Sequence, residues 1–262
     1  MSRWIVSNVP SVLLLAALVV VVAAGTVAVL AYVRHRFPGL AQGGHNDVAK
    51  VGFSVVGPVY GFMIGFIVVV LWGQVNAADE VARTEGASAV QMARDLRYFE
   101  AADSDRIRQS LLEYERAAVA EWSRAASGHS APEAESALAR LYAAYESVQP
   151  RDDRQRAVLA NSLASLDQLS LSRTERLVMA VTNAGPSWSL WLVIFLLSGL
   201  VLGFAVIYGE TRARTHYAMV AAVSVLVAVN LFLVTELAHP FLGELGTSSE
   251  ALREAINYLG PQ

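Results

Sequence analysis

Apolar residues along the chain fall into two pairs of long runs that flank a charged middle segment. The runs are Ser11–Val33, Val51–Val75, Ser189–Tyr208 and Tyr217–Thr235. Each approaches or exceeds the roughly 20 residues that a helix needs to cross the hydrocarbon core of a bilayer. The first run exceeds the core of about 7 to 15 residues in a signal peptide, so we expect it to be retained. The pattern predicts an all-α integral membrane protein with four transmembrane helices.

The middle segment shows helical spacing and no strand-like alternation. One apolar stripe consists of Ile107, Leu111, Tyr114, Ala118 and Trp122. We expect the second span to continue as a helix to Phe99, followed by helices over Asp105–Ala126, from Ser130 onward, and over Arg151–Asn183. Such charged, amphipathic helices predict an antiparallel bundle.

Two short motifs have the form of a capping box, in which a hydroxyl and a glutamate satisfy backbone amides at a helix start. They are Ser130-Ala-Pro-Glu133 and Thr247-Ser-Ser-Glu250. The second predicts a short helix near the carboxy terminus, with Leu252, Ile256 and Leu259 on one side, that packs on the bundle or lies at the lipid surface.

These elements predict four segments. Residues 1–76 hold the first two transmembrane helices with the loop between them, 77–187 the helical bundle, 188–238 the last two transmembrane helices, and 239–262 the tail with its amphipathic helix.

Positive charges in the short loops predict the orientation, because Lys and Arg near a span favour the cytoplasm. Arg34, Arg36 and Lys50 follow the first span, and Arg212 and Arg214 lie between the third and fourth. We therefore expect a multi-pass protein of the cell inner (plasma) membrane, with the bundle and both termini outside the cytoplasm.

Glycines mark one face of the second span. At about 100° per residue, Ser54, Gly57, Gly61, Gly65, Val68 and Trp72 share a stripe, with Asp47 and Lys50 before it and Asp79 after it. Small residues let membrane helices approach closely, so the stripe predicts either a helix-packing seam or the lining of a pore in a ring of subunits. In the second case Asp47, Lys50 and Asp79 form the pore mouths, and the two carboxylates favour cations.

Other polar residues near the spans admit two interpretations each. His45, Asn46 and Asp47 cap the second helix or form a polar ring at its mouth. Glu236, near the end of the fourth span, is an interfacial or paired carboxylate rather than a proton relay. Arg173 and Arg176 pair with acids in the bundle or line a vestibule for anions.

The composition and the absence of certain motifs argue against several classes of function. The hydrophobic fraction of 55% exceeds the roughly 45 to 50% of soluble domains. Cysteine is absent, no metal-ligand spacing or cofactor motif is present, and no basic stripe predicts nucleic-acid binding. The phosphate loop, zinc-protease motif and nucleophile elbow are also missing, so we do not expect an enzyme.

Several motifs together resemble a family of bacterial and plastid membrane proteins with a bestrophin-like domain, whose activity is not established. The first is Gly44-His45-Asn46-Asp47, which precedes the glycine-bearing helix with Tyr60 and Trp72. The second is the pair Arg173 and Arg176, which precedes Pro186 and Trp191. The third is Glu236-Leu237, which is followed by Pro240-Phe241, Gly243 and Ser249-Glu250. The resemblance is nearly end to end, and it implies a distant likeness to bestrophin channels.

The favoured hypothesis is an oligomeric ion channel, or channel-like pore, in which the second transmembrane helix lines the path. A single set of four helices has little room for water, so the conducting form is expected to be a homo-oligomer in contact with lipid and ions. The alternative is an extracytoplasmic sensor or scaffold that acts through a partner.

Overall fold

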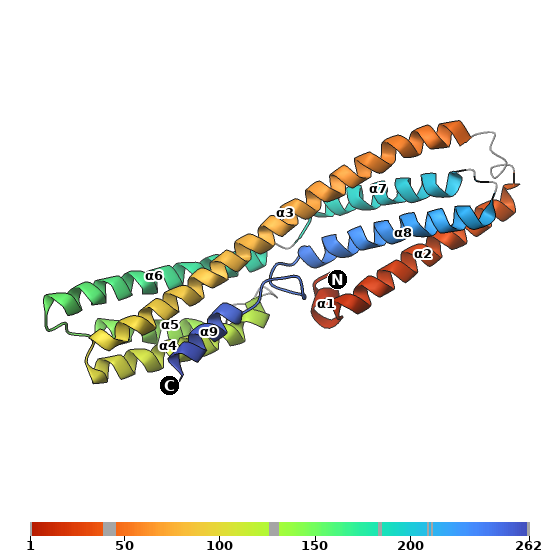
Figure 1. Cartoon of the computed structure of the whole chain (residues 1–262). Coiled ribbons are helices and arrows are strands. Elements are labelled where there is room, and N and C mark those ends of the chain that lie inside the picture. The colour runs from red at the N-terminus through yellow and green to blue at the C-terminus, as the bar shows by residue number, and fades with distance from the viewer. Residues whose placement is uncertain are drawn as a thin grey trace. The chain divides into compact units, whose positions relative to one another are not determined.

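The computed structural model describes residues 2–38, 46–125, 131–182, 185–208, 210 and 212–260, and in these ranges the regular elements are helices. They are α1 (Ser2–Asn8), α2 (Ser11–Arg36), α3 (Asn46–Asp95), a 3-10 turn (Leu96–Tyr98), α4 (Ala101–Ala125), α5 (Pro132–Glu146), α6 (Asp153–Thr182), α7 (Trp188–Ile207), α8 (Ala213–Leu237) and α9 (Glu250–Leu259) (Figure 1). The chain divides into two compact units, one of Met1–Gly73 with Gly185–Ala238 and one of Gln74–Ala184 with His239–Gln262.

The first unit contains the membrane-crossing helices. Within the described residues, α2, α3, α7 and α8 are long and apolar enough to span a bilayer. The four predicted spans and the all-α fold class are therefore confirmed. Helix α1 was not predicted from the sequence, because seven residues without a helical apolar stripe give little signal.

Polar contacts tie the first unit together at both ends of α2. At the start, the Ser11 hydroxyl donates to the fully buried Glu236 carboxylate at 3.0 Å. At the end, the Arg34 guanidinium donates to the Glu210 carbonyl at 3.0 Å and lies 3.0 Å from Nδ1 of His216. Between these contacts α2 and α8 run side by side (Figure 1). The end of α2 and the connection between α7 and α8, which carry the basic residues, therefore lie together.

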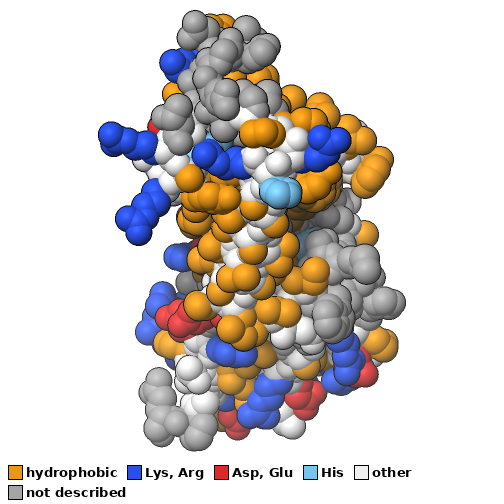
Figure 2. Space-filling view, turned by 90° about the vertical axis from the view of Figure 1, so that its right-hand side faces the viewer, with side chains coloured by type: hydrophobic (Ala, Val, Ile, Leu, Met, Phe, Trp, Pro, Cys, Tyr) orange, Lys and Arg blue, Asp and Glu red, His pale blue; other side chains and the backbone are white. Residues whose placement is uncertain are grey.

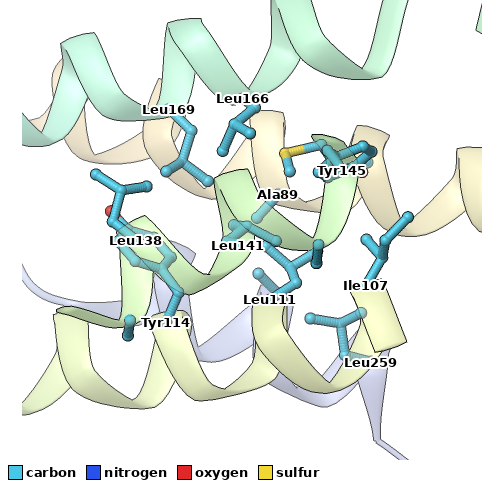
Figure 3. Packing of buried hydrophobic residues seen from close by; sticks show 14 of the residues in the cluster. Ala89, Ile107, Leu111, Tyr114, Leu138, Leu141, Tyr145, Leu166, Leu169 and Leu259 are labelled. Atoms are coloured by element: carbon cyan, nitrogen blue, oxygen red, sulfur yellow. The ribbon is translucent and has the colours of Figure 1, made fainter. Parts of the chain in front are cut away.

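The second unit has a continuous apolar core. Figure 3 shows side chains of α3, α4, α5, α6 and α9 converging on it, with Leu111, Leu141, Leu166 and Leu259 among them. Ile107, Leu111, Tyr114 and Ala118 are fully buried, as their spacing predicted. Burying a Leu or Ile side chain contributes about 1.5 to 3 kcal/mol, so this core is the main source of stability for the unit.

Helix α9 packs on the bundle, which was one of its two expected positions. Leu252, Ala255 and Leu259 join the core, with Ala255 in place of the expected Ile256. Gly86 permits this close approach, because a Cβ there would lie 2.5 Å from the Ala251 carbonyl oxygen.

Of the two predicted capping boxes, the one at Thr247 is wrong. The other depends on Ser130, which lies outside the described residues; Ala131, the residue before α5, makes no side-chain cap. Helix α9 starts after Ser249, again without a side-chain cap, and the Thr247 hydroxyl donates instead to Asp79 at 3.0 Å. Helix α4 also starts earlier than Asp105, at Ala101.

Candidate functional site

The apolar part of α3 has one buried face. Tyr60, Ile64, Ile67 and Leu71, spaced three or four residues apart, are each at most 6% exposed. The Tyr60 hydroxyl lies near Ser198 of α7 and Asn230 of α8. At Gly52 a Cβ would lie 2.4 Å from the Phe204 ring, so that glycine is where α3 comes close to α7. This face is what fixes α3 to the rest of the first unit.

The predicted glycine stripe lies beside the buried face. Ser54, Gly61, Gly65 and Trp72 are exposed, and Gly57 and Val68 are half-buried. A Cβ added at Gly57, Gly61 or Gly65 would meet no described atom within 4 Å. The Ser54 hydroxyl donates to the Val51 carbonyl of its own helix at 2.8 Å. The stripe therefore forms no packing seam with the described part of this chain, and it offers a narrow, small-residue surface without reactive groups.

An apolar flank, which was not predicted from the sequence, borders the stripe. It consists of Val55, Val59, Phe62, Phe66 and Val69. Phe62 is 75% and Phe66 is 61% exposed, which is unusual for aromatic side chains unless lipid or another chain covers them. The signal was present in the sequence as apolar residues three or four positions apart. Figure 2 shows one face of the molecule, where hydrophobic side chains cover a broad area with Lys and Arg beside it.

The predicted mouth residues differ in how the structure places them. Asp47 belongs to α3, but its side chain is not described, and His45 lies outside the described residues. Lys50 is exposed. Asp79 is half-buried and accepts hydrogen bonds from Arg83 Nε at 2.7 Å and from Thr247 at 3.0 Å. Arg83 thus offsets part of the Asp79 charge, and the cation preference inferred from Asp47 and Asp79 stays a prediction.

Arg173 and Arg176 form ion pairs inside the second unit, as one of their two interpretations predicted. Arg176 donates through Nε and Nη2 to Glu85 at 2.7 and 3.0 Å. Arg173 donates through the same two nitrogens to Glu121 at 3.1 and 2.8 Å. Glu85 comes from α3, Glu121 from α4 and both arginines from α6, so this buried charge network joins three helices.

Neighbouring groups complete the buried charge network. The Tyr114 hydroxyl donates to Glu85 at 2.8 Å, and the backbone amide of Ala131 donates to Glu121 at 2.9 Å. The Arg176 guanidinium carbon lies 5.2 Å from the centroid of the Trp122 ring. Arg176 is 1% exposed, so it is not an anion-binding residue of an open vestibule.

Electrostatics in the network follow from burial and pairing. Burial alone would raise the pKa of Glu121, but hydrogen bonds from Arg173 and Ala131 lower the pKa overall. Burial would lower the pKa of Arg176, and its contact with Glu85 raises it above the usual value. The Glu121–Arg173 pair is therefore ionised, and Arg176 keeps its positive charge beside Glu85.

Glu115 is a further buried carboxyl group that sequence reasoning missed. It is fully buried on α4, and neither of its oxygens forms a hydrogen bond within the described residues. Burial, reinforced by the charge of Glu85, raises its pKa well above the usual value, and Arg176 opposes this only in part. A neutral carboxyl group is the form that such a site stabilises.

Taken together, the described helices define an all-α membrane protein whose chain crosses the bilayer repeatedly and carries a second helical unit. The sequence profile described as the Bestrophin-like domain matches residues 20–252, so the chain belongs to that family. The resemblance noted in the sequence is thereby confirmed.

Solved structures agree with this assignment at the level of the fold. A mutant of a bacterial Bestrophin homologue from Klebsiella pneumoniae has a TM-score of 0.62 at 13% identity, over 95% of this chain and 98% of that chain. A second mutant of that homologue has a TM-score of 0.59 at 16% identity, over 95% and 97%. Among curated protein sequences, none matches the chain significantly.

Proposed function

We propose that the protein is the subunit of a homo-oligomeric ion channel in which α3 lines the path. The observation that carries this proposal is the outward face of α3, where the glycine stripe meets no described atom of its own chain. An exposed small-residue face in a membrane helix favours contact with another helix or with a water-filled path. Membership of the Bestrophin-like family supports the same conclusion.

The proposal needs several copies of the chain. The described helices of the first unit pack on one another through α2, α7 and α8, with the inner face of α3 buried. A path for hydrated ions among them would require removing that packing. A ring of subunits instead provides a central space towards which each α3 presents its exposed face.

In the proposed assembly, Ser54 lies near the cytoplasmic end of the stripe and Val68 towards the other end. Val68 can form a constriction that gates by excluding water, because a ring of valines offers no hydrogen bonds. The basic segments at the end of α2 and between α7 and α8 lie together. We infer from their charge that this end faces the cytoplasm, with the second unit and both termini outside.

Flux measurements test the channel directly. Purified protein reconstituted in liposomes is expected to carry ions down a salt gradient, and light scattering in detergent is expected to give a mass of several subunits. A monodisperse monomer without flux under any gradient would contradict the proposal.

Accessibility of single cysteines tests which face lines the path. The chain has no native cysteine, so each introduced thiol is unique. A charged thiol reagent is expected to block flux in Gly61→Cys and to leave Ile64→Cys unmodified, because Ile64 is 1% exposed. Block in Phe66→Cys without block in Gly61→Cys would show that the apolar flank lines the path and that the glycine stripe joins neighbouring subunits.

A sensor or scaffold that acts through a partner is the second candidate. A surface cavity in the second unit favours it, since three arginines line that cavity and none of them forms an ion pair with a described residue. Ligand binding without ion flux would select this function over the channel.

A further inference from the structure

A surface cavity of about 640 Å³ opens in the second unit where four helical segments meet. Its polar lining comprises Arg94 at the end of α3, Arg97 in the 3-10 turn, Ser104 and Arg108 on α4, and Tyr258 on α9. This volume falls within the range of about 300 to 1,000 Å³ that small-molecule sites occupy. None of the described residues that line it is acidic.

The three arginines of the cavity lack compensating carboxylates. None of them forms an ion pair with any residue that the structure describes. By contrast, Arg106, which is two residues before Arg108 on α4, pairs with Asp103. Arg106 of the same helix thus has an acidic partner, whereas the arginines that line the cavity have none among the described residues.

One arginine has a structural role as well. Arg94 lies in the last turn of α3, where a cation interacts favourably with the helix dipole, and its guanidinium carbon is 5.9 Å from the centroid of the Tyr258 ring. Arg97 lies against a ring as well, with its guanidinium carbon 4.8 Å from the centroid of Tyr98, whereas Arg108 has no ring contact among the described residues. Ser104 and Arg108 are one helical turn apart on α4, so a hydroxyl and a guanidinium face the same cavity.

Like charges around one cavity repel each other, and an anion that enters it relieves the repulsion. Guanidinium groups bind phosphate in a bidentate manner, and each such charge-assisted pair is about twice as strong as a neutral hydrogen bond. Arginines from separate helical segments can contact different oxygens of one ligand, which favours a multivalent anion over a monovalent one.

We propose that this cavity binds a compact multivalent oxyanion that carries linked or multiple phosphate groups. Two sources share this chemistry: a small phosphorylated solute and the phosphorylated headgroup of a lipid. Binding there is a property separate from ion conduction by α3, so it is tested without measuring flux.

Calorimetry on the full-length protein in detergent at low ionic strength tests the proposal, with inorganic pyrophosphate as the probe. The protein is expected to bind pyrophosphate, and Arg97→Gln and Arg108→Gln are each expected to weaken binding about tenfold or more. Arg116→Gln is the matched control, because Arg116 is an exposed arginine of α4 outside the cavity. Its affinity is expected to equal that of the parent.

A second measurement identifies the source of the phosphate. In a flotation assay, purified protein in detergent-free nanodiscs is mixed with liposomes that contain a phosphoinositide or with liposomes of phosphatidylcholine alone. The amount of protein that floats with each kind of liposome is compared. Phosphoinositide-dependent flotation that is lost in Arg108→Gln but kept in Arg116→Gln supports a lipid headgroup, whereas pyrophosphate binding alone supports a solute. Binding to neither probe, or equal loss in Arg116→Gln and Arg108→Gln, would overturn the proposal.

Discussion

Arg176 brings a positive charge into the interior of the second unit, where water cannot stabilise it. Desolvation of an ion is costly, and a buried pair offsets that cost only with good geometry and further hydrogen bonds. Arg176 makes two bonds to Glu85 and Tyr114 makes a third, while Nη1 of Arg176 has no hydrogen-bond partner among the described residues. The network therefore matters for stability mainly because removing one member leaves the opposite charge buried without a partner.

Arg176→Met tests this penalty. It leaves Glu85 buried without its cation, so we expect a loss of about 3 to 5 kcal/mol of stability, measured by thermal or denaturant unfolding of the purified protein. The control is Arg140→Met, which breaks the exposed pair with Glu113. That change is expected to cost less than about 1 kcal/mol. Equal losses in the two variants would show that the network is not desolvated.

Glu115 predicts a dependence of stability on pH. Its pKa is raised in the folded state, so above the usual value of 4.5 the unfolded chain releases a proton that the folded chain retains. Stability contributed by this group is thus present below about pH 4.5 and falls as the pH rises towards the folded pKa.

Glu115→Gln removes that proton linkage. We expect its melting temperature to exceed that of the parent at neutral pH, with the difference shrinking as the pH approaches 4.5. Glu113→Gln, two residues away, removes only the exposed pair with Arg140 and should stay within about 1 kcal/mol of the parent at every pH. A difference between Glu115→Gln and the parent that does not vary with pH would show that Glu115 is ionised in the folded protein.

The sequence alone predicted the kind of contact that some residues make but not their partners. Arg173 and Arg176 were expected to pair with acids, because charges in an amphipathic bundle need partners. Their partners could not be identified, since Glu85 is 91 residues from Arg176 along the chain. The same limit applies to the arginine cavity, where Tyr258 of α9 meets Arg94 of α3.

Among the elements, α3 carries the most specific prediction. Gly61→Val places an isopropyl group on the exposed glycine stripe, where its Cβ meets no described atom within 4 Å. The subunit should therefore fold, while assembly or conduction is lost because the bulk separates neighbouring backbones. Size-exclusion chromatography and liposome flux measure the two outcomes.

Gly73→Val is the matched control for that variant. Gly73 is an exposed glycine of the same helix with open space at its Cβ, about 100° away from the stripe by helical spacing. Normal assembly and flux in Gly61→Val, or identical defects in both glycine variants, would remove the stripe from the mechanism.

Helix positions could be predicted from the sequence where the burial of apolar residues determines them. The four spans follow from apolar length alone, and the bundle helices follow from the spacing of residues such as Ile107 and Leu111. Helix starts were less predictable, because a hydroxyl near a start has competing partners. Thr247 donates to Asp79, in another element, rather than capping α9.

At the scale of the whole molecule, the orientation in the membrane is the main prediction. Reporter fusions at Gly39 and Arg212 are expected to give a cytoplasmic signal, because the basic segments around both positions favour that side. A fusion after Gly260 is expected to report the opposite side. A non-cytoplasmic signal at Gly39 or Arg212 would reverse the proposed topology, placing the second unit and its arginine cavity in the cytoplasm.

The buried charge network also determines how the second unit opens. If α6 detached alone, Glu85 of α3 and Glu121 of α4 would remain in the interior without counter-charges, so partial opening costs nearly as much as opening all three helices. We expect amide hydrogens of α4, α6 and the adjoining part of α3 to exchange with deuterium as one cooperative group, detected by mass spectrometry of peptides. Helix α9, which joins the core through apolar side chains, should exchange faster. Much faster exchange in α6 than in α4 would show that the charges do not couple the helices.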